Sequence, residues 1–353
     1  MPTEFGQDEI NRYLVTEQFY GIGKTNLQKL RNSRVVIIGC GGLGSDVASL
    51  LTRTGVGFIR LVDRCILELD DLQSHILYKE HDVKEGLPKA IAAAESLFLI
   101  NSTISFEPVV TDINRLNILK IISDADLVID AVDNTESHFL INEACVKLGK
   151  PLIFSATAQS AGITMTIIPQ KTSCLKCVYD NISLVSSFLQ NEKTVSLGST
   201  VLLTAAIQAT EAIKILINDK RQLNKNLIHI DLWQNHYQLI DVTKSKIQKN
   251  CPVCNNHQFD LLTGKRGTIY IKPIGSNRIQ IIPFTATKID LPQLAIHLSS
   301  TRMVKANDYH VRFEVDQYQI TVFANGRAII KGTTDNGIAR NLYRKFITLI
   351  LQL

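Results

Sequence analysis

Apolar runs and helix-like segments alternate along the first half of the chain. Residues 34–38 form a β-branched run that ends at a glycine-rich turn, and residues 43–54 then place apolar side chains three and four positions apart. Residues 58–62 form a second apolar run, which stops at Asp63. This order of strand, helix and strand predicts a β-α-β unit with parallel strands and a right-handed crossover.

The same alternation continues downstream. We predict helices at residues 89–99 and 136–148, and strands at residues 104–110, 125–131, 151–154 and 162–169. Alternation over this length predicts a doubly wound, mostly parallel α/β sheet of the Rossmann type. Ligands bind at the carboxyl ends of the strands in such sheets, and Gly39, Asp63 and Asp133 all lie where predicted strands end.

The pattern is less regular between residues 170 and 255. Residues 172–199 are polar, and we predict an irregular loop that lies over the ligand pocket. Residues 197–217 predict a long apolar helix, and residues 227–232 and 237–242 predict a hairpin. We assign residues 1–255 to the first domain.

After residue 255 the chain changes to short alternating runs. These predict strands at residues 267–272, 278–283, 309–315 and 318–323 and helices at residues 291–298 and 335–351. The mixture indicates a small α+β domain, residues 256–353, whose sequence carries no motif that we can attach to chemistry.

Composition excludes several classes of partner. The net charge of +5 is spread along 353 residues without a run of five like charges, which argues against a nucleic-acid groove. The amino terminus lacks the basic and then apolar order of a signal peptide. Residues 195–218 are long enough to span a bilayer, but they contain Glu211 and Lys214, so we predict a buried helix and no membrane partner.

Seven cysteines, an odd number, fit a reducing compartment better than a disulfide framework, and we predict a cytoplasmic protein. Four of them form two Cys-x-x-Cys pairs, and these are Cys174 with Cys177 and Cys251 with Cys254. Two such pairs supply the four thiolates of a closed, structural zinc site. Cys40, Cys65 and Cys145 lie within or beside apolar runs, and we predict buried, unreactive thiols there.

The glycine-rich turn is the first candidate ligand site. Gly39, Gly41 and Gly44 satisfy the G-x-G-x-x-G pattern between a predicted strand and helix, and Asp63 follows at the distance of a ribose-binding acid. The pattern alone does not separate NAD from ATP, and a tight turn without a ligand is the structural alternative.

The residues that accompany the turn favour ATP. Asp130 and Asp133 end an apolar run, where a carboxylate could bind the magnesium ion of a nucleotide. Asp133, followed by Asn134, is the better candidate, although a helix N-cap is an equal alternative. Lys89 follows Pro88 at a predicted helix start and could reach a phosphate, or could be a solvated surface lysine.

Taken in order, these segments resemble a known family. From about residue 12 to residue 254 the chain resembles the ubiquitin-activating-enzyme-like adenylyltransferases of bacteria, the MoeB, ThiF and HesA family, which activate sulfur-carrier proteins for molybdopterin and thiamine-thiazole synthesis. The resemblance rests on RVVIIGCGGLGS, LVD ending at Asp63, Leu72 with Gln73, LPK ending at Lys89, DAVDN, CLKC, EAIKIL and CPVC. The last hundred residues resemble an extension carried by some Gram-positive members.

The resemblance implies a homodimer in which ATP lies over Gly42, with Asp63 on the ribose, Lys89 on the phosphates and Asp133 holding magnesium. The C-terminal Gly-Gly carboxylate of a small ubiquitin-like carrier protein, or of a peptide, would attack the α-phosphate, giving an acyl-adenylate and pyrophosphate. Asp133 and Lys89 are then the expected catalytic residues. The expected cofactor-binding residues are Gly39, Gly41, Gly42, Gly44, Asp63, Asp71, Gln73, Lys89, Asp133 and Asn134.

The chain also departs from the family. Val15 and Ser74 stand where the resemblance implies arginines, and Asp71 stands where it implies an asparagine. His75, beside Ser74, is expected to be a surface histidine. No cysteine lies between residues 177 and 251, which argues against a covalent sulfur relay.

Two other functions stay open at this stage. A catalytically impaired member could act as a binding module, or as one half of a heterodimer whose partner supplies the missing arginines. An NAD-dependent enzyme would use the same glycine turn, but the sequence offers no evident acid or base for hydride transfer and no role for the cysteine pairs.

Overall fold

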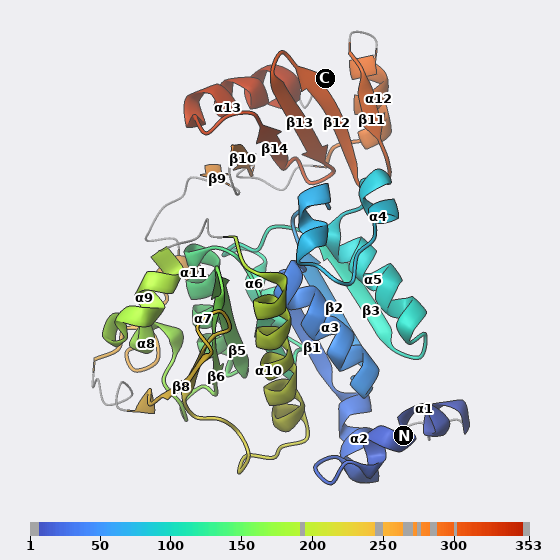
Figure 1. Cartoon of the computed structure of the whole chain (residues 1–353). Helices are drawn as coiled ribbons and strands as arrows, with labels where there is room; N and C mark the ends of the chain where they lie inside the picture. Colours follow the sequence, from blue (N-terminus) through green and yellow to red (C-terminus); the bar gives the residue numbers. More distant parts are fainter. Residues whose placement is uncertain are drawn as a thin grey trace. The chain divides into compact units, whose positions relative to one another are not determined.

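The computed structural model describes residues 7–190, 195–243, 250–263, 271–273, 277–282, 288–299 and 302–348. The chain forms two compact units, residues 1–266 and 267–353, and each is described by itself (Figure 1). The first unit extends past residue 255 because the short helix α11 (Asp260–Thr263) packs against α7 (Thr135–Leu148). Backbone amides of α11 donate to the carboxylate of Glu143 in α7.

The first unit is built on an eight-stranded sheet with the order β3-β2-β1-β4-β5-β6-β7-β8. The strands are β1 (Arg34–Ile38), β2 (Phe58–Asp63), β3 (Ser105–Val110), β4 (Leu127–Asp130), β5 (Leu152–Ala158), β6 (Ala161–Ile167), β7 (Leu227–Asp231) and β8 (His236–Ile240). The first five in this order are parallel, and β6, β7 and β8 run antiparallel to their neighbours. The predicted doubly wound, mostly parallel sheet is therefore confirmed.

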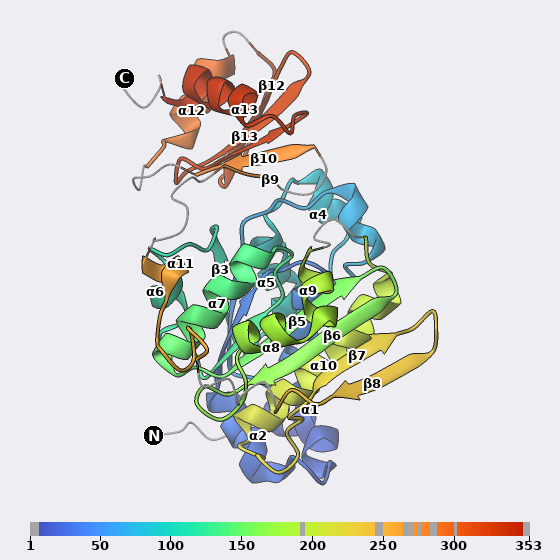
Figure 2. The ribbon, with the colours of Figure 1, turned by 90° about the vertical axis from the view of Figure 1, so that its left-hand side faces the viewer.

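Helices cover both faces of this sheet (Figure 2). Besides α7 and α11 they are α1 (Gln7–Gln18), α2 (Gly23–Asn32), α3 (Gly42–Thr54), α4 (Glu80–Lys84), α5 (Lys89–Ile100), α6 (Ile118–Ile122), α8 (Leu175–Asn181), α9 (Ser183–Gln190) and α10 (Gly198–Leu216), with a 3-10 helix at Leu69–Gln73. The prediction of an irregular segment at residues 172–199 was wrong, because α8 and α9 lie there. Val185, Phe188 and Leu189 recur at helical spacing, and Val185 and Leu189 are buried.

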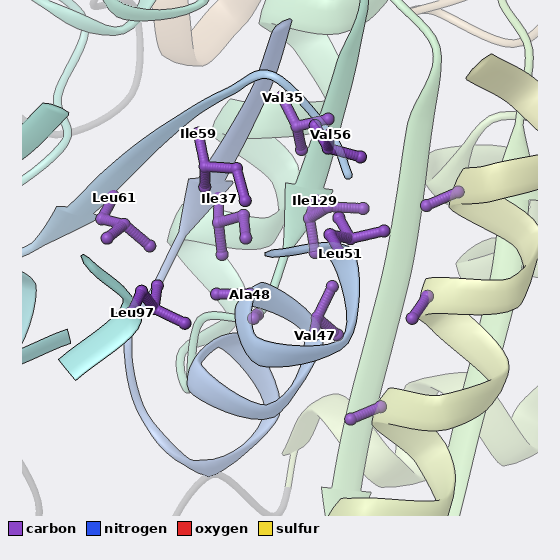
Figure 3. Close-up of a cluster of buried hydrophobic side chains, with 14 of the residues drawn as sticks. Val35, Ile37, Val47, Ala48, Leu51, Val56, Ile59, Leu61, Leu97 and Ile129 are labelled. Atoms are coloured by element: carbon purple, nitrogen blue, oxygen red, sulfur yellow. The ribbon is translucent and has the colours of Figure 1, made fainter. Parts of the chain in front are cut away.

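Strand β1 divides its side chains between two cores. Val35 and Ile37 pack with α3, α5 and α10 on one face, whereas Val36 and Ile38 pack with α6, α7 and α8 on the other. Figure 3 shows Val35 and Ile37 beside Leu51 of α3. Burial on both faces explains why β1 is an unbroken apolar run rather than an alternating one.

Helix α10 is the one helix in the described part of the chain that is long and apolar enough to cross a membrane. Half of it is buried, and it packs against α3 and β6. Gln208, fully buried, donates to the backbone carbonyls of Asp130 and Ile153. These contacts are those of a core helix.

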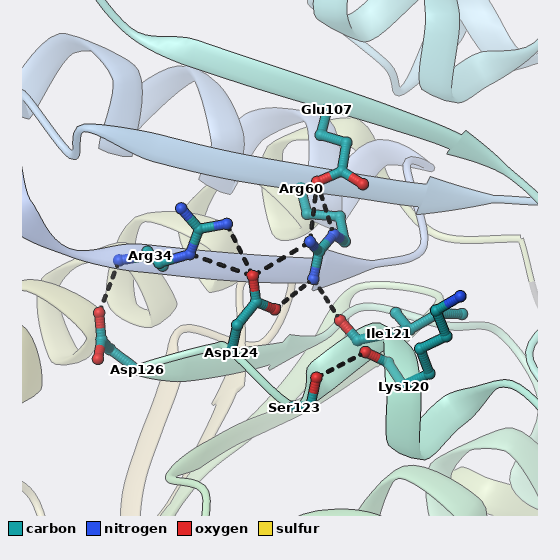
Figure 4. A network of polar contacts seen from close by, with 8 residues as sticks. All are labelled: Arg34, Arg60, Glu107, Lys120, Ile121, Ser123, Asp124 and Asp126. Carbon is teal, nitrogen blue, oxygen red and sulfur yellow. Dashed lines mark hydrogen bonds and ion pairs between the residues drawn. The ribbon is translucent and has the colours of Figure 1, made fainter.

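A charged network ties the sheet together (Figure 4). Arg60 of β2 forms ion pairs with Glu107 of β3 at 2.8 Å and with Asp124 at 2.6 Å, and Arg34 of β1 meets the same Asp124 at 2.7 Å. Hydrogen bonding from Arg60 is the main cause that lowers the pKa of Asp124 to about 2. The network links β1, β2 and β3 to the segment that leads into β4.

The second unit has a six-stranded antiparallel sheet with the order β11-β12-β13-β14-β10-β9. Its elements are β9 (Ile271–Pro273), β10 (Arg278–Ile281), α12 (Leu291–Ser299), β11 (Val304–Ala306), β12 (His310–Val315), β13 (Tyr318–Phe323), β14 (Ala328–Lys331), α13 (Asn336–Tyr343) and a π-helical turn at Arg344–Thr348. The predicted α+β character is confirmed. Residues 267–270, 283 and 349–351 of the predicted elements lie outside the described residues.

Candidate active site

The glycine turn joins β1 to α3 through contacts that admit no side chain. Gly39 has φ +95°, and a Cβ there would lie 2.3 Å from the carbonyl oxygen of Ala131. A Cβ on Gly44 would lie 1.8 Å from the carbonyl oxygen of Gly39. Glycine at both positions lets the amino end of α3 come close to the ends of β1 and β4, where its free amides can meet an anion.

A cavity of 320 Å³ opens at the carboxyl ends of the parallel strands. Eight of the ten predicted cofactor-binding residues line it, and these are Gly39, Gly41, Gly42, Asp63, Asp71, Lys89, Asp133 and Asn134. Gly44 instead packs against Gly39, and Gln73 is exposed outside the lining. Phe188, Leu189 and Ser196 border the cavity, so part of the segment at residues 172–199 does lie beside it, as predicted.

Asp63 is fixed in orientation at the end of β2. Its Oδ2 accepts a hydrogen bond from the backbone amide of Cys40 at 2.7 Å, and its Oδ1 accepts from that of Cys65 at 2.6 Å. Cys65 is half-buried at the cavity wall rather than fully buried, and burial raises the pKa of its thiol to about 11. Cys65 therefore stays protonated and unreactive near neutral pH.

Lys89 begins α5 and forms an ion pair with Asp71, with 2.7 Å between Nζ and Oδ1. The two side chains are only 12% and 19% exposed, so Lys89 is not a solvated surface lysine. Burial lowers the pKa of Lys89, but Asp71, Cys65 and Asp63 together raise it by more, and the ammonium stays charged. The other oxygen of Asp71 accepts from the amide of Glu68 and caps the 3-10 helix.

Asp133 and Asn134 divide the two roles that the sequence left open. The side chain of Asn134 accepts from the amide of Ser137 and is the N-cap of α7. Asp133 is 75% exposed at the cavity, with its Oδ1 3.7 Å from Nη2 of Arg64. Desolvation raises the pKa of Asp133, but Arg64, the Asn134 side chain and Lys89 together lower it by more, so the carboxylate is charged and accessible to a ligand.

Asp130 cannot share the role of Asp133. It is fully buried, and its Oδ2 lies 2.8 Å from Nδ1 of His138, another buried residue whose ring lies across from Phe154. The Asp130 carboxylate is therefore paired with His138 inside the protein and does not face the cavity.

Sequence reasoning missed two charged residues of the cavity, Arg64 and Asp112. Arg64 Nη1 lies 2.8 Å from Oδ1 of Asp112, and the side chains are 11% and 4% exposed. Burial lowers the pKa of Arg64, but Asp112, Cys65 and Asp133 together raise it by more. The signal was present, because Asp112 follows the predicted strand β3 at nearly the same place as Asp63 ends β2.

The prediction of a surface position for His75 was wrong. His75 is 9% exposed, lines the cavity and packs edge-on against Tyr78. Burial, followed by the charge of Lys89, lowers its pKa to about 4. His75 is neutral at pH 7 and does not replace the arginine that the resemblance implies at Ser74.

The two cysteine pairs meet on the face of the sheet that carries α7 and α8. Their sulfur atoms all lie within 4.8 Å of one another, with 3.7 Å between Cys174 and Cys177, 3.8 Å between Cys174 and Cys251 and 3.4 Å between Cys177 and Cys254. Thiolates at about 2.3 Å from a tetrahedral zinc would be about 3.8 Å apart. The cluster therefore fits a four-coordinate metal with no open position.

One relative matches nearly the whole length of this chain, and another matches most of it. Sulfur carrier protein ThiS adenylyltransferase of Bacillus subtilis is 35% identical over 337 residues, which cover 95% of this chain and 99% of that protein. Sulfur carrier protein adenylyltransferase of Thermus thermophilus is 28% identical over 255 residues, covering 71% of this chain and 92% of that protein.

A solved structure agrees with the fold over most of this chain. MccB of E. coli, crystallised with ATP, matches with a TM-score of 0.58 at 25% identity, over 72% of this chain and 76% of MccB. The ThiF family matches residues 15–253, the region in which the sequence resemblance was found. The chain therefore belongs to the ThiF family of adenylyltransferases.

Proposed function

We propose that this protein uses ATP and magnesium to adenylylate the C-terminal glycine carboxylate of a small ubiquitin-like sulfur-carrier protein, with release of pyrophosphate. The observation that carries the proposal is the match to the Bacillus subtilis ThiS adenylyltransferase over 99% of that protein's length. The cavity at the glycine turn, with Asp63, Lys89 and Asp133 in its lining, supports it.

The residues of the cavity divide the binding of a nucleotide among them. The backbone amides at the start of α3, beside Gly41 and Gly42, would donate hydrogen bonds to phosphate oxygens. The carboxylate of Asp63 would accept hydrogen bonds from the ribose hydroxyls. Lys89, kept charged by Asp71, would stabilise the negative charge that develops as pyrophosphate leaves.

The charge balance of the cavity fits a divalent cation. Its lining holds the carboxylates of Asp63, Asp71, Asp112 and Asp133 but only two cationic side chains among the described residues, Arg64 and Lys89. A triphosphate adds further negative charge, so a hard cation is needed beside it. Asp133, exposed and ionised, would hold magnesium, which when bound would neutralise phosphate charge.

The remaining features of the proposal follow from the donor sets and the resemblance. The four cysteines would hold a structural zinc ion, because their spacing matches its tetrahedral geometry. The enzyme would work as a homodimer in the cytoplasm. Without a cysteine between residues 177 and 251, it would release the acyl-adenylate to another protein rather than form a thioester in that segment.

Exchange of labelled pyrophosphate into ATP tests the reaction. With carrier protein and magnesium, the unaltered protein should support exchange, and Asp133→Asn should abolish it. Asp219→Asn, outside the cavity, is the matched control and should retain exchange. Absence of exchange with sulfur carriers encoded in the same genome would contradict the proposal.

A second function is favoured by one observation, namely that Val15 and Ser74 offer no arginine. A partner homologue could supply the missing cations, which would make this chain one half of a heterodimer. Exchange that begins only when the chain is mixed with an arginine-bearing homologue would support this alternative. Nucleotide binding without exchange in either case would indicate a binding module.

A further inference from the structure

A second cavity, of 640 Å³, lies in the first unit at the other end of the parallel strands. Its walls come from the segments that lead into β4, β5 and β7, from the segments that follow β6 and β8, and from the end of α10. Helix α10 separates the two cavities. Val201 near its start lines the cavity at the glycine turn, whereas Lys214 and Ile215 line the second cavity, about 20 Å further along the helix.

The second cavity has an excess of positive charge. Its described lining has a single carboxylate, Asp126, and four lysines, which are Lys171, Lys214, Lys220 and Lys225. Oδ2 of Asp126 already accepts a hydrogen bond from the backbone amide of Arg34 at 2.8 Å (Figure 4). Neither Lys220 nor Lys225 forms an ion pair with an acidic side chain in the described part of the chain. A lining of this charge favours an anionic ligand.

One corner of the second cavity is held by a buried carboxylate. Oε1 of Glu211 lies 2.5 Å from Nζ of Lys214, and its Oε2 accepts from the backbone amide of Asn224 at 3.0 Å and from the hydroxyl of Thr166 at 3.4 Å. These contacts join α10, β6 and the segment that leads into β7. The EAIKIL segment, residues 211–216, thus builds a wall for which the proposed reaction has no use.

The rest of the lining is largely apolar. Its apolar side chains are Pro151, Ile168, Pro169, Ile215, Leu223 and Val242. Oγ1 of Thr172 accepts from the backbone amide of Ile168 at 2.8 Å, and Oγ of Ser173 donates to the carbonyl of Val242 at 2.8 Å, so the ends of β6 and β8 are tied in place. A cavity of a few hundred Å³ with apolar walls and a few polar groups has the character of a small-molecule site.

We propose that the second cavity binds a small organic anion with an apolar body, meaning an aromatic or acyl molecule that carries a carboxylate, sulfonate or phosphate group. The anionic group would meet the ammonium groups of Lys220 and Lys225, and the apolar body would lie against Ile168 and Ile215. The proposal does not depend on the reaction at the glycine turn, because none of these four residues lines that cavity.

Two fluorescent probes test the proposal on the full chain. 8-Anilinonaphthalene-1-sulfonate carries one negative charge on an apolar ring system, and N-phenyl-1-naphthylamine has the same rings without the charge. In excess magnesium ATP, the unaltered protein should bind one sulfonate per chain. Lys220→Glu combined with Lys225→Glu should weaken that binding by about tenfold or more, as expected for the loss of contacts to a charged group, and should leave binding of the uncharged probe unchanged.

The matched control is Lys24→Glu combined with Lys120→Glu. It changes the net charge equally at exposed positions outside both cavities, and it should keep the affinity for the sulfonate. Equal sulfonate affinity in the two double variants would overturn the proposal.

Two measurements on the unaltered protein need no substitution. Sulfonate binding should weaken as salt rises, because an ion pair at exposed lysines is screened, whereas binding of the uncharged probe should not. Sulfonate binding that is independent of salt would overturn the proposal. Displacement of the sulfonate by magnesium ATP would also overturn it, because the probe would then occupy the cavity at the glycine turn.

Discussion

The ammonium of Lys89 lies 2.7 Å from Oδ1 of Asp71, and this contact holds the charge of the lysine at the cavity wall. The resemblance implies an asparagine at Asp71, so the carboxylate is an addition that offsets the cation facing the phosphates. A phosphate group that binds the Lys89 ammonium must compete with the Asp71 carboxylate, which already lies at hydrogen-bond distance from it.

Asp71→Asn should therefore strengthen binding of magnesium ATP. We expect the dissociation constant to fall by about fivefold, because one buried negative charge near the phosphates is removed while an oxygen remains to cap Glu68. Calorimetry measures the change. Asp70→Asn in the same 3-10 helix, outside the cavity lining, is the control, and an unchanged or weaker affinity in Asp71→Asn would contradict the argument.

Two glycines of the same turn should respond differently to alanine. In Gly44→Ala the new Cβ would meet the backbone oxygen of Gly39 at 1.8 Å, so we expect a loss of about 3 kcal/mol or more in the free energy of unfolding by urea. In Gly41→Ala the nearest atom is His75 Nε2 at 3.7 Å, an ordinary contact. That variant should unfold like the unaltered protein but bind ATP weakly, and equal stability of the two variants would refute the distinction.

Asp46 in α3 predicts a pH dependence of stability. It is 1% exposed, neither oxygen has a partner in the described structure, and burial raises its pKa to about 7. In the unfolded chain it ionises near pH 4, so between about pH 4 and pH 7 only the folded state holds the proton. Stability should therefore fall as pH rises through that window and level off above it.

Asp46→Asn should remove this dependence. At pH 8 the variant should be more stable than the unaltered protein by up to about 4 kcal/mol, and near pH 4 the two should be alike. Urea unfolding across pH 4–8 measures both. Curves that stay parallel over the whole range would show that Asp46 does not titrate in this way.

Zinc in the cysteine cluster should contribute directly to the folding free energy. We expect one zinc per chain by atomic absorption, and Cys254→Ser should lose it together with several kcal/mol of stability. Cys145→Ser replaces a buried thiol outside the cluster and should keep the metal. Full zinc content in Cys254→Ser would exclude the four-thiolate site.

Ser74 gives a test of the missing arginine. Ser74 lines the cavity, so Ser74→Arg would place a cation beside Lys89. If the chain works alone with too little positive charge, pyrophosphate exchange should rise by about tenfold or more, since a single phosphate-binding arginine contributes at least that much in phosphoryl transfer. No gain, with the fold retained, would show that the site is complete without it.

Patterns of neighbouring residues in the sequence were enough to predict much of this fold. Residues 34–38 and 58–62 were predicted as strands because they are short apolar runs, and the structure has β1 and β2 there. The meeting of the two cysteine pairs followed from the ligand number of zinc. Helices α1 and α2 were not predicted, and they occupy a polar region where apolar positions are sparse.

The parts of the fold and of the site that were not predicted depend on contacts between residues far apart in the sequence. Arg64 and Asp112 are 48 positions apart, and their pairing depends on β2 and β3 being neighbours in the sheet. His75 follows the polar pair Gln73 and Ser74, which suggests a surface, yet Tyr78 and the glycine turn enclose it. Whether such a side chain is buried depends on tertiary packing, which cannot be predicted from the neighbouring residues alone.

The cysteine cluster supports a part of the protein beyond its own four sulfur atoms, namely one wall of the cavity. Cys177 lies in α8, and the chain passes from α8 through Ile182 into α9, whose Phe188 and Leu189 stand against the nucleotide cavity. If the cluster holds the proposed zinc ion, a cell deprived of zinc would lose the support of that wall along with the metal. The supply of a trace element would then govern the throughput of a step whose chemistry never touches it.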